Sequence, residues 1–67
     1  MILSKRNVDR VYKSFEKSLV GVPFDVSHEL DIPLTELLGI IQYLENRKLI
    51  VCVRVGEDKA SSLYEYN

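Results

Sequence analysis

The sequence contains a single cysteine, Cys52, which lies within an apolar run. One cysteine cannot form an internal disulfide, and no neighbouring cysteine or histidine gives the spacing of a zinc site. A lone cysteine of this kind is usually a small buried hydrophobe. We therefore expect Cys52 to lie in the core, no metal to be bound, and a reducing, cytoplasmic setting.

Long apolar runs are also missing. No segment approaches the roughly 20 apolar residues that span a bilayer, and Lys5 and Arg6 interrupt the N-terminus where a secretory signal needs an apolar run. The chain has no glycine-rich phosphate loop, and its serines have no histidine–carboxylate partners that would suggest a nucleophile. We expect no membrane partner, no cofactor and no enzymatic activity.

Basic residues are absent from the middle of the chain. From Ser18 to Asn46 there are five acidic residues and no lysine or arginine. Residues 1–20 carry +3 (five basic, two acidic) and residues 21–67 carry −4 (four basic, eight acidic), which together give the net charge of −1. This asymmetry bears on the partners of the protein and not on its fold.

The length and the apolar content favour one small folded domain over residues 1–67, since 46% of the 67 residues are hydrophobic. Residues 4–19 predict a helix, because their apolar side chains recur at helical spacing. These side chains are Val8, Val11, Tyr12, Phe15 and Leu19. Ser4 is the expected N-cap, and Gly21 to Pro23 is expected to stop the helix.

The next segment predicts a short extended piece at residues 22–24 and then a short second helix. Asp25 or Ser27 is the expected cap of that helix, with Val26 and Leu30 on its inner face. After a turn that contains Pro33, a third helix is expected from about residue 34 to residue 47.

Two apolar segments near the C-terminus predict strands at residues 49–55 and 61–66, with a polar turn at residues 56–59. An isolated hairpin is marginal in water, so it must pack on the helices. The expected fold class is therefore α+β, with three helices capped by an antiparallel β-hairpin. That is the winged-helix arrangement, in which the hairpin is called the wing.

The spacing of apolar residues resembles that of the winged helix-turn-helix superfamily. The matching positions are Val26, Ser27, Leu30, Ile32, Leu37, Ile41, Leu44, Leu49 and Ile50. Asp31 and Lys48 stand where the family usually has glycine, at positions that tend to need a left-handed residue. The stretch IPLTELLGIIQYLENRKLIVCVRV is most similar to the winged helix of archaeal transcription factor E, whose zinc ribbon this chain lacks.

The resemblance implies a DNA-binding protein associated with transcription regulation, with duplex DNA as its partner. The family pattern turns Leu37, Ile40, Ile41 and Leu44 inward, and relatives that bind DNA use the opposite face of the third helix. With the basic residues of the helix exit and the wing, the candidate nucleic-acid-binding residues are Thr35, Gln42, Tyr43, Asn46, Arg47, Arg54 and Lys59.

The charge pattern qualifies this expectation, because most affinity for duplex DNA comes from lysine and arginine. The helix-turn-helix segment offers neither, so the basic contacts must come from the wing or from other edges. Four basic residues lie opposite the apolar stripe of the first helix, as a solvated face or as a single-signed patch: Arg6, Arg10, Lys13 and Lys17.

An alternative function follows from two leucines on the third helix. Leu34 and Leu38 are four residues apart and form an apolar ledge if the family pattern holds. With Tyr43, they would then suit a partner protein or a second copy of the chain. The other possibility is a rotated helix that buries both leucines and leaves Ile40 at the edge.

Overall fold

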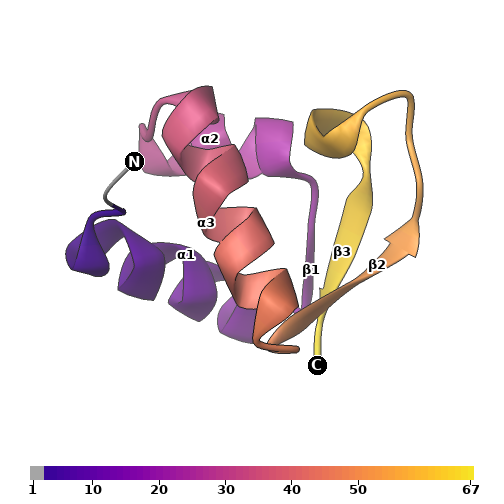
Figure 1. The fold of residues 1–67 in the computed structure, drawn as a ribbon, viewed down its shortest axis with the longest axis horizontal. Helices are drawn as coiled ribbons and strands as arrows, with labels where there is room; N and C mark the ends of the chain where they lie inside the picture. Colours follow the sequence, from indigo (N-terminus) through magenta and orange to yellow (C-terminus); the bar gives the residue numbers. More distant parts are fainter. Residues whose placement is uncertain (1–2) are drawn as a thin grey trace.

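Three helices pack against one side of a three-stranded antiparallel sheet (Figure 1). The computed structural model describes residues 3–67. The elements in chain order are α1 (Lys5–Ser18), β1 (Val20–Gly21), α2 (Pro23–Leu30), α3 (Leu34–Asn46), β2 (Ile50–Arg54), the 3₁₀ turn η1 (Lys59–Ser61) and β3 (Leu63–Tyr66). The strand order in the sheet is β1-β3-β2. The fold is therefore α+β, as expected.

Helix α1 begins where the sequence predicts, because the Ser4 hydroxyl accepts a hydrogen bond from the backbone N–H of Asn7 (3.4 Å). The helix ends within one residue of the predicted position, but Gly21 to Pro23 do not stop it. Leu19 takes the left-handed conformation (φ 70°) and ends the helix, and its side chain is 57% exposed, outside the apolar stripe. Gly21 lies in β1, where an added Cβ would come 3.0 Å from the Phe15 ring. Its role is therefore close packing.

Helix α2 starts before both of the expected caps, because its N-cap lies three residues ahead of Asp25 and five ahead of Ser27. Val22 is the N-cap and has no side-chain hydrogen bond, and Pro23 occupies the first turn, where its fixed φ suits a helix. The predictions of an extended segment at residues 22–24 and of a cap at Asp25 or Ser27 are thus wrong. Ser27 is buried and donates to the Ile32 carbonyl (2.7 Å), which closes the turn after the helix.

Helix α3 presents the predicted face to the core. Leu37, Ile40, Ile41 and Leu44 are all buried. The rotated helix is therefore wrong, because Ile40 lies in the core and not at an edge. Asp31 (φ 55°) and Lys48 (φ 61°), on either side of α3, are both left-handed, which confirms the expectation for these two positions.

Strands β2 and β3 form the predicted antiparallel hairpin, with Ile50 opposite Tyr66 and Cys52 opposite Tyr64. A bulge interrupts the register between Cys52 and Arg54. The predicted four-residue turn is wrong, because the connection runs from residue 55 to residue 62 and contains η1. The pairing of β1 with β3, which makes the sheet three-stranded, was not predicted.

All three helices and the sheet contribute to one core. Its buried side chains are Val11, Phe15, Val26, Ile32, Leu37, Ile40, Ile41, Leu44, Ile50 and Tyr64. Cys52 packs against this core but is only half-buried, so the prediction of a buried cysteine holds in part. Within residues 3–67, no helix has the length and apolar character needed to cross a membrane.

Candidate nucleic-acid interface

The outward side of α3 carries three exposed polar side chains along its length, Thr35, Gln42 and Asn46. The Gln42 amide donates to the Asn46 side-chain oxygen (2.8 Å). The Lys59 ammonium group, from η1, donates to the side-chain oxygen of Gln42. A hydrogen-bonded row of Lys59, Gln42 and Asn46, here called the α3–η1 row, thus joins the helix to the hairpin loop.

Lys59 reaches α3 because a local hydrogen-bond network folds the loop back. The Asp58 carboxylate accepts from the backbone N–H of Ser61 (3.0 Å), and the Ser61 hydroxyl accepts from the N–H of Asp58 (3.2 Å). The buried Ser62 hydroxyl accepts from the N–H of Gly56 (3.0 Å) and donates to the Asp58 carbonyl (2.8 Å). The contacts between Asp58 and Ser61 form a capping box with Asp58 at the N-cap and Ser61 at N3. The usual pattern has serine or threonine first and glutamate or glutamine at N3, so the only sequence signal was an acid at a favourable cap position.

Gly56 is required by the same network. A Cβ at this position would lie 2.5 Å from the Ser61 carbonyl oxygen, which is shorter than any real contact of this kind. The loop backbone can therefore close on itself only with glycine at residue 56. This close approach fixes the direction from which Lys59 meets the helix.

Tyr43 and Arg47 form a second group, on the side of α3 that faces α1. The Arg47 guanidinium lies 5.3 Å from the centroid of the Tyr43 ring, within the range of a cation–π contact. Both residues line a groove with Val8 and Tyr12 of α1. Six of the seven predicted residues therefore lie on α3, at its C-cap or at η1. Five of them form the two groups described above, and Thr35 lies apart near the start of the helix.

The seventh predicted residue, Arg54, lies elsewhere. It follows the bulge in β2 and pairs with Leu63 of β3. Side chains alternate along β3, where Tyr64 and Tyr66 pack on the core and Glu65 is exposed. Leu63, and Arg54 opposite it, are therefore assigned to the sheet face that points away from the helices.

The acidic residues of α3 are partly occupied by other contacts. The Glu36 carboxylate accepts from the Asn7 side chain (2.8 Å), whose oxygen accepts in turn from Arg10 (3.0 Å). Glu45 is half-buried beside the sheet. Burial raises the pKa of the Tyr64 hydroxyl, and the charge of Glu45 raises it further, so Tyr64 remains neutral at physiological pH.

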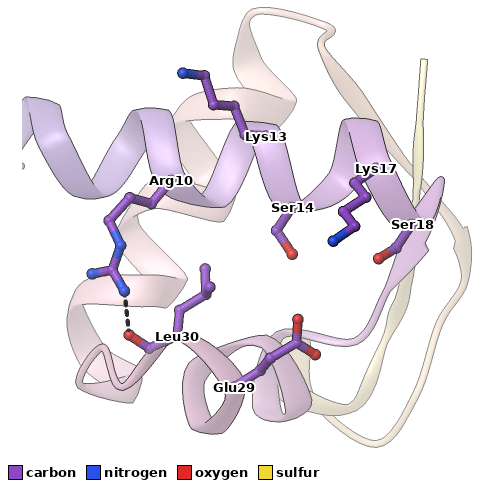
Figure 2. A pocket seen from close by; sticks show the side chains of 7 residues that line it. All are labelled: Arg10, Lys13, Ser14, Lys17, Ser18, Glu29 and Leu30. Atoms are coloured by element: carbon purple, nitrogen blue, oxygen red, sulfur yellow. Dashed lines mark hydrogen bonds between the residues drawn. The ribbon is translucent and has the colours of Figure 1, made fainter.

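The four basic residues of α1 are exposed, and they lie on another surface. Figure 2 shows the groove between α1 and α2 that Arg10, Lys13 and Lys17 line together with Glu29. Arg10 donates to the Leu30 carbonyl (2.7 Å), and Lys13 pairs with Asp9 (3.2 Å). The Glu29 carboxylate points into the same groove, so the local charge is not purely positive.

The two leucines behind the alternative function differ in their surroundings. Leu34 is half-buried and packs against the core, so it supports the fold. Leu38 is also half-buried but is not part of the packing around that core. Tyr43 is 39% exposed. An apolar contact surface on α3 would therefore depend on Leu38 and Tyr43 more than on Leu34.

Comparisons with known protein families, with curated proteins and with solved structures find no match to this chain.

Proposed function

We propose that this protein is a winged-helix domain that binds duplex DNA through α3 and the wing, in association with transcription. The α3–η1 row carries the proposal, because it joins the wing to the exposed polar side of the helix. Amide side chains such as Gln42 and Asn46 can hydrogen-bond to adenine or to phosphate oxygens. Lys59 and Arg47 supply positive charge at the two sides of the same helix end.

The charges of this surface predict weak binding with a modest salt dependence. Each phosphate neutralised by a lysine or arginine contributes a slope of about −0.9 to the dependence of log affinity on log salt. Few basic residues border the α3 surface, so few phosphates are neutralised. The slope of log affinity against log salt should therefore be small but measurable. Arg54 is not part of the proposed surface, because it lies on the other face of the sheet.

The test measures duplex binding by fluorescence anisotropy at micromolar protein over a series of salt concentrations. Lys59→Ala should weaken binding to any sequence and reduce the salt slope by about 1. Gln42→Ala should change the preference among sequences instead. Lys13→Ala is the matched control, since Lys13 is an exposed lysine on α1 that is paired with Asp9.

Two outcomes would reject the proposal. One is no detectable binding at low salt. The other is an equal loss of affinity in Lys59→Ala and Lys13→Ala, which would show that only net charge matters and that the α3 surface has no special role.

A second candidate function is protein contact through α3. The observations in its favour are that Leu38 lies outside the core packing and that the Tyr43 ring is 39% exposed. Their five-residue spacing puts them on different sides of α3, so each would contact a partner separately. Leu34 would border such a surface. A leucine-to-lysine change at residue 38 separates the two functions, because a new cation favours DNA and opposes an apolar protein contact.

A further inference from the structure

The sheet face that points away from the helices is unusually apolar. Val20 of β1 and Val51 of β2 lie on either side of Glu65 in β3, in one row across the three strands. Val20 is 45% exposed, Val51 43% and Val53 50%. In Figure 1 the helices lie on the other side of the sheet. At the edges of this face, Val20 and Leu63 line a groove with residues of α1 and α2, and Val51 lines one with Glu45 of α3. We call the surface formed by Val20, Val51, Val53, Arg54, Leu63 and Glu65 the outer sheet face.

The edges of the sheet are poorly suited to pairing with a further strand. Strand β1 has only two residues, and β2 carries the bulge between Cys52 and Arg54. Short edge strands and bulges are devices that suppress edge-to-edge pairing. The apolar groups are therefore available for contact through the face and not through an edge.

The charges on the outer sheet face are self-complementary. Glu65 is its acid and Arg54 its base, and neither forms an ion pair with another residue of the described part of the chain. An apolar surface with one charge of each sign matches a copy of itself when each base meets the other's acid. Nucleic acid fits less well, because Glu65 would repel phosphate at the centre of the face.

We propose that the outer sheet face is the interface of a homodimer with two-fold symmetry. Glu65, Val51, Arg54 and Leu63 lie at the corners of a rectangle, with Glu65 opposite Val51 and Leu63 opposite Arg54. Consider a two-fold axis that lies in the plane between the two facing sheets and bisects the Glu65–Arg54 diagonal at a right angle. Rotation about this axis places Arg54 of each subunit opposite Glu65 of the other, so the dimer contains two such ion pairs. The other diagonal lies near this axis, so Val51 and Leu63 each meet their counterparts.

The size of the face predicts reversible association. A standard interface takes about 800 Å² from each partner, which is about a sixth of the 4583 Å² of accessible surface of this protein. Three short strands offer less than that on one face, and interfaces below the standard size are typically transient. The dimer should therefore form with increasing protein concentration.

The test uses two charge reversals, Arg54→Glu and Glu65→Arg, in sedimentation velocity without DNA, from micromolar to millimolar protein. Each variant alone would face two like-charge pairs across the interface, so its dissociation constant should rise at least about tenfold. An equimolar mixture of the two variants restores both attractive pairs in a heterodimer. The mixture should therefore associate as the unchanged protein does.

Several results would overturn the proposal. These are an unchanged protein that stays monomeric at millimolar concentration, single variants that associate normally, or a mixture that associates no better than its components. The mixture also controls for folding, because misfolded variants cannot complement each other. Arg6→Glu, a reversal of an exposed charge in the first turn of α1 at the opposite end of the helix from β1, should leave the association unchanged.

Discussion

At the scale of single residues, Leu19 bears an avoidable conformational cost. A left-handed backbone costs a residue with a Cβ about 1–2 kcal/mol, while glycine adopts it freely but loses more entropy on folding. The Leu19 side chain is 57% exposed and contributes little burial. Leu19→Gly should therefore raise the free energy of unfolding by about 0.5–1 kcal/mol, and the melting temperature by a few degrees.

Urea unfolding of the Leu19→Gly variant measures this gain. Leu19→Ala is its matched control, because alanine shortens the side chain but keeps the left-handed cost. A gain of equal size in Leu19→Ala would contradict the explanation and would point to the exposed side chain instead.

At the scale of elements, one side of α3 faces the core and the other faces solvent, and Leu38 lies at the boundary between these sides. Leu38→Lys should leave the domain folded, with a stability change near the 0.5 kcal/mol that is usual for surface positions, because Leu38 does not pack with the core. If α3 binds DNA, the new cation should strengthen duplex binding. If α3 binds a protein, the Leu38→Lys change should abolish that contact, because the lysine ammonium group would lose its water in an apolar interface.

Melting temperature, duplex affinity and sedimentation of Leu38→Lys together separate these outcomes. Self-association should be unchanged, since the outer sheet face does not include α3. A variant that unfolds would show that Leu38 belongs to the core, and a folded variant with unaltered DNA affinity would count against DNA binding by this helix.

At the scale of the whole molecule, Tyr66 links the last strand to the first helix. Its hydroxyl lies 3.2 Å from that of Tyr12 and donates to Glu16 (3.4 Å). The hydrogen bond with Tyr12, aided by burial and by Glu16, raises the pKa of Tyr66 from 10.0 to about 12. The folded protein thus holds this proton more tightly than the unfolded chain does.

The stability from this raised pKa is fully present below pH 10 and is lost as the pH rises toward 12, because the unfolded tyrosine ionises first. Urea unfolding at several pH values in this range should show a steeper loss of stability in the unchanged protein than in Tyr66→Phe. Lysines and the other tyrosines titrate in both proteins, so the difference isolates Tyr66. Parallel curves would contradict the proposed role of the hydroxyl.

Local chemistry in the sequence determined much of this fold. The Ser4 cap, the inward face of α3 and the β2–β3 hairpin were all predicted, because capping and hydrophobic periodicity depend on neighbouring residues. The left-handed positions of Asp31 and Lys48 were also predicted, through the family resemblance. Five of the seven candidate site residues were placed on the third helix or at its exit by the same information.

Only the tertiary structure decided which of these residues meet. Strand β1 has two residues and forms only because β3 lies beside it, so no local pattern marks it. Lys59 meets Gln42, 17 residues away, because the loop folds back onto α3. The bulge in β2 changes which face of the sheet Arg54 occupies. A regular strand alternates its side chains between the two faces, and one extra residue shifts every later side chain to the opposite face.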